Sequence, residues 1–408
     1  MKYDSPRALL ERLLPPALAF LRRQVETNSF TADPEGVRRN AEIVAEGFRE
    51  LGFTPELCPA EDPRYGPHLF LNRPGTGGAS LLLVTHLDTV FSREEEERNA
   101  FRWMVDGDRI FGPGVIDNKG GTAMIWLVLA ALREIDPRLF EATHWIIGAN
   151  ALEEVLTEDF PSRCAERIPA RCRAALVFEA SVGLEPGLAL VQCRKGSANF
   201  RVSASGRGAH AGSRHQDGAN AIVELAGVVG RIAALTDPSR GLTANVGSIS
   251  GGGPSNRVPH AAECFVNIRA FAEPVLQDAI DAMFRLENAP PTVRAVSDGF
   301  PCTVRVELLG RNPAWPPNPQ TETLIAHWSE AAGKAGIALR AEPRGGLSDG
   351  NFLSRFLPVL DGLGPWGGNG HASERSADGS KLPEFVFVPS FLEMAEVNVG
   401  AIRNLLGS

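Results

Sequence analysis

Short, continuous apolar runs recur through the first 190 residues, and they limit the folds open to this chain more than any other feature. Examples are SLLLVTHLDTV at 80–90, THWIIGAN at 143–150 and AALVFEA at 174–180. Helical patterns, such as those at 36–51 and 121–135, lie between them. Apolar runs of this length, bounded by turn residues, are typical of strands buried on both faces of a parallel sheet. The sequence therefore predicts an α/β fold.

The pattern changes near Arg194, where apolar and polar residues begin to alternate. Strand-like and helix-like segments then follow in the order β-α-β-β-α-β, which is the split unit of a ferredoxin-like domain. After Pro313 and the Pro316-Pro317 pair, a helical segment at 321–335 resumes the earlier style. We therefore predict a larger α/β domain in two parts, 1–193 and 313–408, with an inserted ferredoxin-like domain at 194–312.

The composition excludes several classes of protein. With 408 residues, 43% of them hydrophobic, the chain has ample material for a buried core. A formal charge of -8, without basic blocks, argues against nucleic acid as a partner. The longest apolar stretch, 122–132, is shorter than the ~20 residues of a membrane span. The six cysteines form no CxxC pair, so we predict reduced thiols and a cytoplasmic protein.

Four predicted strands each lead to side chains that can bind a metal ion. Because ligand crevices of open parallel sheets lie outside the carboxyl ends of the strands, these groups are expected to converge in space. The strand-end groups are His86 with Asp88, Glu153 with Glu154, Glu179, and His371 in a glycine-rich loop after the run at 356–365.

Asp88 and Asp117 each allow a specific role. His86 and Asp88 are two apart on an extended segment and point to the same side, so Asp88 can accept the second imidazole N–H. Asp117 lies in FGPGVIDNKGG at 111–121, where glycines permit a tight backbone. Its carboxylate can bridge two cations, or it can cap the helix that starts near Asn118. This segment alone supports both interpretations equally.

Glu153 and Glu154 are adjacent, so in extended backbone their side chains diverge. One can then bind metal while the other faces the substrate as a general base. The candidate ligands offer nitrogen and oxygen but no thiolate. Such donors favour catalytic zinc, with cobalt or manganese as substitutes.

These motifs resemble a known family. HLDT at 86–89, GVIDNKGG at 114–121, the pair at 153–154, Glu179 and GNGH at 368–371 are similar to the motifs of dinuclear zinc metallopeptidases and amidohydrolases. This family contains carboxypeptidase G, acetylornithine deacetylase, succinyl-diaminopimelate desuccinylase, aminoacylase and tripeptidase. The resemblance covers nearly the whole chain. It implies a zinc-peptidase-like catalytic domain, an inserted ferredoxin-like dimerisation domain and a homodimer.

The resemblance also implies roles for the site residues. Two zinc ions would be held by a ligand set in which Asp117 is the bridge, Glu153 would be the catalytic base, and Asp88 would support His86. The peptide bond between Asp117 and Asn118 is often cis in the family. The implied metal ligands are His86, Asp117, Glu154, Glu179 and His371.

Further motifs resemble the family's substrate-facing segments. By this resemblance, His210 in GRGAHAGS would reach the active site of the partner subunit and stabilise the oxyanion. Asn256 and Arg269 would bind the substrate carboxylate, a bidentate task to which arginine is suited. Arg344 and Gly346 belong to a segment like the family's glycine-rich loop near that pocket. A solvated strand residue is the competing interpretation of Arg269.

The predicted activity is hydrolysis of an amide bond in a small peptide or N-acyl amino acid with a free carboxylate. A glutamate-releasing carboxypeptidase is the first choice and an N-acyl amino acid deacylase the second, although VLTEDF at 155–160 departs from the carboxypeptidase G pattern. One rival is a serine hydrolase, because 346–350 fits GxSxG around Ser348, with Asp361 and His371 following. Another rival is a non-catalytic relative that binds amino acid derivatives, for which a base such as Glu153 would serve no purpose.

Overall fold

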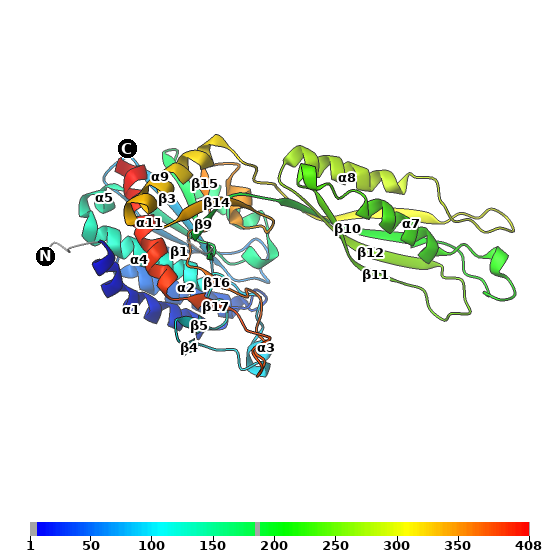
Figure 1. The fold of residues 1–408 in the computed structure, drawn as a ribbon, viewed down its shortest axis with the longest axis horizontal. Coiled ribbons are helices and arrows are strands. Elements are labelled where there is room, and N and C mark those ends of the chain that lie inside the picture. Colours follow the sequence, from blue (N-terminus) through cyan, green and yellow to red (C-terminus); the bar gives the residue numbers. More distant parts are fainter. Residues whose placement is uncertain (1–5, 184–187, 408) are drawn as a thin grey trace. The chain divides into compact units, whose positions relative to one another are not determined.

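A computed structural model describes residues 6–183 and 188–407 (Figure 1). The chain divides into two compact units. The first comprises Met1–Gln192, Pro317–Pro343 and Ser348–Ser408, and the second comprises Cys193–Pro316 with Arg344–Leu347. The second unit contains the segment 194–312 for which the sequence predicts an inserted domain. It also takes in a short returning segment, 344–347, which the sequence analysis assigned to the catalytic part.

The first unit is built on a six-stranded sheet with the order β1-β2-β6-β3-β7-β15. The neighbours β6, β3, β7 and β15 run parallel, whereas β2 is antiparallel to both β1 and β6. All seven residues of β3 are buried, as expected for a central strand covered on both faces. The strands are β1 (Thr54–Cys58), β2 (His68–Arg73), β3 (Ser80–His86), β6 (His144–Asn150), β7 (Cys172–Val177) and β15 (Val359–Leu360).

Helices cover both faces of this sheet. Leu81 and Leu83 share one core with five helices, and Phe160 of a sixth helix stacks on Phe70, with ring centroids 5.7 Å apart. The first five are α1 (Pro6–Val25), α2 (Pro34–Arg49), α4 (Lys119–Ile135), α9 (Pro319–Ala335) and α11 (Pro389–Gly407), and the sixth is α6 (Asp159–Arg167). Shorter helices are α3 (Arg93–Arg98), α5 (Pro137–Ala142), α10 (Asp349–Leu353) and the 3₁₀ turn η1 (Glu153–Val155).

Two smaller sheets complete the layout around these elements. One has the order β16-β17-β5-β4, with antiparallel neighbours throughout. Its strands are β4 (Met104–Asp106), β5 (Arg109–Phe111), β16 (Gly367–Gly368) and β17 (Phe385–Phe387). The other has the order β14-β9-β8, formed by β8 (Val182–Gly183), β9 (Leu188–Arg194) and β14 (Leu339–Arg344).

The second unit is a four-stranded antiparallel sheet with the order β11-β12-β10-β13. In chain order this is β-α-β-β-α-β, so the predicted ferredoxin-like arrangement is confirmed. Alternate residues of β12 are buried under two helices, which lie on one side of the sheet in Figure 1. The elements are β10 (Gly196–Ser205), α7 (Ala221–Ala233), β11 (Thr243–Gly251), β12 (Ala261–Ala270), α8 (Glu273–Glu287) and β13 (Thr303–Asn312), with 3₁₀ turns η2 (His215–Asp217) and η3 (Pro238–Arg240).

Two further observations concern the whole described chain. Within residues 6–183 and 188–407, none of the helices combines the length and apolarity needed to cross a membrane. All six cysteines are free thiols, as the sequence analysis predicted.

Candidate metal centre

His86 is the last residue of β3, and its side chain is almost fully enclosed, with 1% of the residue exposed. Its Nε2 lies 2.9 Å from Oδ1 of Asp117 and 3.7 Å from Oε1 of Glu179. On the other side of the ring, Nδ1 lies 3.0 Å from the backbone oxygen of Asp88 and 3.4 Å from its Oδ1. An N–H on Nδ1 would leave the lone pair of Nε2 facing the carboxylates, which is the tautomer that binds a metal.

Asp117 lies between two histidines. Its Oδ1 faces His86, and its Oδ2 lies 3.2 Å from Nε2 of His371. The peptide bond to Asn118 is cis. Helix α4 has Asn118 as its N-cap residue, without a side-chain capping bond, so the Asp117 carboxylate does not cap the helix. Of the two interpretations that the sequence left open, the structure favours the one in which Asp117 faces both sides of a site.

Glu153 and Glu154 are held by Asp88. The strand β6 ends at Asn150, and the two glutamates form the turn η1 instead of the extended backbone assumed from the sequence. The Asp88 carboxylate accepts the N–H of Glu153 at 3.2 Å and that of Glu154 at 3.3 Å, as well as the Thr31 hydroxyl at 2.9 Å. Asp88 thus connects the histidine at the end of β3 to the glutamates that follow β6.

Glu179 and Asn118 form the third part of the cluster. Glu179 follows β7, and its Oε1 accepts a hydrogen bond of 2.9 Å from Nδ2 of Asn118. The residue after Asp117 therefore orients a carboxylate that follows β7. No sequence pattern predicted this role for Asn118, although it lies within the motif GVIDNKGG.

His371 reaches the cluster from a loop. Its backbone has a φ of 67°, and 55% of its side chain is exposed. Its Nε2 lies 3.3 Å from Oε2 of Glu154 in addition to its contact with Asp117. The loop thus brings a candidate ligand to the groups that follow the strands.

These contacts resolve into two groups of three that share one residue. In each group, one ligand atom per residue lies within 4.8 Å of the others. The first group is His86, Asp117 and Glu179, and the second is Asp117, Glu154 and His371. All five predicted ligands are therefore brought together from five separate regions of sequence. Imidazole nitrogen and carboxylate oxygen at such separations suit a divalent metal such as zinc.

The convergence of carboxylates alters the acidity of the cluster. Hydrogen bonds to Asp117 and Glu154 raise the pKa of His371 to about 10. Burial lowers the pKa of His86, but its bonds to carboxylates such as Asp117 outweigh burial and hold that pKa well above the ordinary value. Burial raises the pKa of Glu153 well above its usual range. A cluster that attracts protons this strongly would attract a divalent cation in their place.

A buried carboxylate behind the cluster escaped the sequence analysis. Glu384 is 0% exposed and accepts backbone N–H groups of Ile116, Asp117 and His371. Burial and the nearby charge of Asp117 raise the pKa of Glu384 to about 8. Its place directly before the apolar run FVFV did not single it out, because the other candidate glutamates follow their strands.

The predicted substrate residues all lie in the second unit. His210 is exposed, and its Nδ1 accepts the N–H groups of Gly212 and Ser213 at 3.2 and 3.1 Å. Asn256 is also exposed, and its backbone oxygen accepts the N–H of Ala211 at 2.8 Å. The structure therefore brings the His210 and Asn256 segments side by side.

Arg269 meets the glycine-rich segment. Its Nη1 donates to the backbone oxygen of Gly345 at 2.7 Å, and its Nε donates to Oδ1 of Asn267 at 2.9 Å. Arg344 is half-buried and Gly346 is exposed in the same segment. Arg269 is thus anchored beside the loop that contains Arg344 and Gly346, rather than extended into solvent as in the competing interpretation.

The geometry around Ser348 does not form a serine-hydrolase triad. The Ser348 hydroxyl is buried, donates to Oδ2 of Asp361 at 2.8 Å and accepts the N–H of Gly350 at 3.0 Å as the N-cap of α10. A nucleophile would instead donate to a histidine that the aspartate orients. His371, the histidine of the proposed triad, faces Asp117 and Glu154. Ser348 is accounted for as a helix cap.

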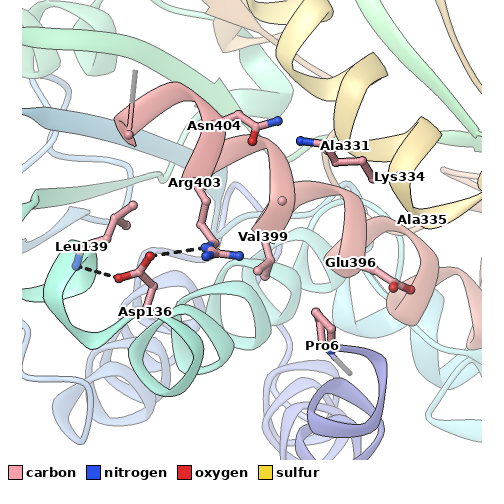
Figure 2. A pocket seen from close by; sticks show the side chains of 12 residues that line it. Pro6, Asp136, Leu139, Ala331, Lys334, Ala335, Glu396, Val399, Arg403 and Asn404 are labelled. Atoms are coloured by element: carbon pink, nitrogen blue, oxygen red, sulfur yellow. Dashed lines mark hydrogen bonds and ion pairs between the residues drawn. The ribbon is translucent and has the colours of Figure 1, made fainter. Parts of the chain in front are cut away.

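The first unit contains two hollows that differ in their relation to the candidate ligands. One, of about 660 Å³, is lined by His371 and by residues of α3 and of the loop after His371. The other, of about 590 Å³, lies among α9, α11 and the start of α1 (Figure 2). There Asp136 pairs with Arg403 at 3.4 Å, and Lys334 and Glu396 add one charge of each sign. The described residues lining this second hollow include none of the candidate metal ligands, whereas His371 lines the first. The first hollow is therefore the one that belongs to the candidate metal centre.

Comparison with known proteins was made for sequence and for fold. Residues 193–288 match the family of peptidase dimerisation domains. Carboxypeptidase G2 of Pseudomonas sp. (strain RS-16) is 28% identical over 390 residues, which are 93% of this chain and 89% of that protein. Acetylornithine deacetylase of Klebsiella pneumoniae (strain 342) is 30% identical over 282 residues, which are 65% of this chain and 70% of that protein.

Solved structures share the fold. The crystal structure of a tripeptidase from Staphylococcus aureus subsp. aureus Mu50 has a TM-score of 0.76 at 20% sequence identity. The match covers 97% of this chain and 99% of that one. The similarity therefore extends over both units and not only over the dimerisation-domain segment.

Proposed function

The chain belongs to the M20 family of metallopeptidases and amidohydrolases, and we propose that it hydrolyses an amide bond next to a free carboxylate with two zinc ions. One observation carries the proposal. The two oxygens of the Asp117 carboxylate face different histidines, His86 and His371, so that two groups of ligands share one residue. A shared carboxylate of this kind is what a two-metal site needs at a separation of about 3.5–4 Å.

The donors support zinc as the metal. Each group offers one imidazole and two carboxylates, with no thiolate, and three protein ligands leave a position open for substrate or water. Cobalt or manganese would fit the same donors. When bound, the metal ions would polarise the amide carbonyl and make water a stronger nucleophile.

Glu153 is the proposed general base. It is buried, with 8% exposed, and its backbone N–H is fixed by Asp88 beside its neighbour Glu154. In this role the Glu153 carboxylate takes a proton from the attacking water and delivers it to the leaving amine. Burial raises the pKa of Glu153, and a carboxylate with a raised pKa is a stronger base toward water.

The substrate residues stay proposals based on resemblance. We assign Arg269 and Asn256 to the substrate carboxylate, with Arg344 and Gly346 in the adjoining loop. The bond from Arg269 to Gly345 fixes the direction of its guanidinium and leaves other N–H groups for a carboxylate. His210 is proposed to act on the oxyanion in the active site of the partner subunit, and the dimerisation-domain match supports a homodimer. The free cysteines support a reducing compartment such as the cytoplasm.

The relatives support a choice of substrate class. The match to carboxypeptidase G2 spans most of both chains, and we place a glutamate-releasing carboxypeptidase first for that reason. The match to acetylornithine deacetylase keeps an N-acyl amino acid deacylase as the second candidate. Both reactions break an amide bond beside a carboxylate, so one ligand set would serve either.

The test is a substrate screen with matched controls. The purified protein, stripped with a chelator and reloaded with zinc, is offered N-acyl glutamates, other N-acyl amino acids, dipeptides and tripeptides. We expect turnover only after zinc is restored. Glu153→Gln should bind zinc like the wild type but lose about 10²–10⁴-fold in kcat. Turnover that survives zinc removal, or a Glu153→Gln variant with wild-type kcat, would refute the proposal. Sensitivity to a serine-directed phosphonate would support the Ser348 alternative.

A further inference from the structure

Glu384 lies between the two backbone segments that carry Asp117 and His371. Its Oε1 accepts the N–H groups of Ile116 at 3.0 Å and Asp117 at 3.3 Å, and its Oε2 accepts that of His371 at 3.4 Å. Its own N–H donates to the backbone oxygen of Ala372 at 2.7 Å. One buried side chain therefore binds two segments that are more than 250 positions apart in the sequence.

The small sheet β16-β17-β5-β4 explains how Glu384 can contact both backbone segments. Glu384 directly precedes β17, which pairs with β5 on one side and β16 on the other. The strand β5 leads into the loop with Asp117, and β16 leads into the loop with His371. Glu384 thus directly precedes the strand that runs between β5 and β16, the two strands that lead into the loops of Asp117 and His371.

The His371 loop depends on this anchoring. The His371 side chain is 55% exposed, so packing holds it weakly, and both Asn369 and His371 have positive φ. The Asn369 side chain donates to the backbone oxygen of Leu382 at 3.0 Å, which ties the same loop to the segment before Glu384. Loops with little packing open locally at low free energy unless such bonds hold them.

We infer that Glu384 is a positioning residue that fixes Asp117 and His371 relative to each other and so sets the affinity of the metal position formed by Asp117, Glu154 and His371. The inference rests on the proposed metal-dependent function. Glu384 is no ligand itself, because both of its oxygens point at backbone N–H groups. Residues that orient metal ligands typically change metal affinity about 10–100-fold when substituted.

Glu384→Gln tests the two halves of this contact separately. A glutamine oxygen in place of Oε1 can still accept the N–H groups of Ile116 and Asp117, whereas its amide NH₂ would then face the N–H of His371. We therefore expect one zinc ion to bind as in the wild type and the other about 10–100-fold more weakly, as measured by competition with a chromophoric chelator. Excess zinc should restore most of kcat.

Glu224→Gln is the matched control. Glu224 is buried, with 1% exposed, and its Oε2 accepts three hydrogen bonds from Thr292 and Val293 in the second unit. Its substitution disturbs a comparable buried carboxylate without touching a candidate ligand, so both zinc affinities should be unchanged. Wild-type affinities at both positions in Glu384→Gln, or an equal loss at both, would overturn the inference. A wild-type protein that binds no zinc would instead overturn the proposed function.

If the Glu384→Gln variant does not fold, hydrogen exchange of the metal-free wild type tests the inference instead. We expect the His371 amide to exchange at least about tenfold more slowly than an unstructured amide, since Glu384 accepts its N–H. Exchange at the unstructured rate would show that Glu384 does not hold the loop and would contradict the inference.

Discussion

The two halves of the candidate centre are held in different ways. His86 ends a central strand, is 1% exposed and has partners on both ring nitrogens. His371 lies in a loop, has more than half of its side chain exposed and relies on Glu384 for its backbone position. Asp117 belongs to both halves. The sheet therefore fixes one half, while a few hydrogen bonds between loops fix the other.

This difference has a functional consequence. A preformed position binds a metal ion without first ordering its ligands, whereas a loop-borne position must offset that ordering cost from the binding free energy. We expect a tighter metal position at His86, Asp117 and Glu179 and a weaker one at Asp117, Glu154 and His371.

Asp117→Ala should erase the contrast by damaging both positions. Because the carboxylate is shared, zinc content is expected to fall from two ions to nearly none, and kcat/KM by more than about 10⁴-fold, since each metal ion contributes several kcal/mol. Metal analysis after dialysis and steady-state kinetics would measure both. Retention of one tightly bound ion would show that Asp117 does not serve both positions.

Asp88→Asn should act on both halves but more mildly. Asn keeps one oxygen to accept an N–H from the glutamate turn, but its NH₂ cannot replace the second acceptor. Zinc affinity is expected to drop about 10–100-fold, while the melting temperature changes little. Chelator competition on the purified variant measures this. Unchanged affinity at both positions would remove Asp88 from the supporting role.

Replacing His86 or His371 with alanine should lower the stability of the metal-free protein by different amounts. His86→Ala removes a buried ring and should lower the free energy of unfolding by about 2 kcal/mol, because it leaves a cavity and buried carboxylates without a donor. His371→Ala opens no buried cavity, because its side chain is 55% exposed, so only the lost bonds to Asp117 and Glu154 count and the decrease should be smaller, about 1 kcal/mol. Denaturant unfolding in the presence of chelator compares them. Equal losses would contradict the distinction between the halves.

The strand-borne half could be predicted from the sequence. The run at 80–90 predicted a buried strand that delivers His86, and parallel pairing of β3, β6 and β7 then gathers residues from distant segments at one edge. The ferredoxin-like order of the second unit also followed from pattern. In these regions, the spacing of apolar residues in the sequence reflects which faces are buried, so strands and helices can be recognised from it.

The loop-borne half could not be predicted in the same detail. The strands β5, β16 and β17 have two or three residues each, too few for a recognisable period, so the sheet that joins the two ligand loops left no pattern. The role of Glu384 depends on that sheet. The extended backbone assumed for Glu153 and Glu154 was wrong because Asp88, more than sixty positions away, accepts both of their N–H groups and stabilises a turn.

Anomalous X-ray scattering at the zinc absorption edge, from crystals of the zinc-loaded protein, would test the central claim most directly. The account predicts two anomalous peaks about 3.5–4 Å apart, with Asp117 between them. At limiting zinc, the peak beside His86 and Glu179 should fill before the one beside Glu154 and His371. A single peak, or peaks bound by other residues, would contradict the account.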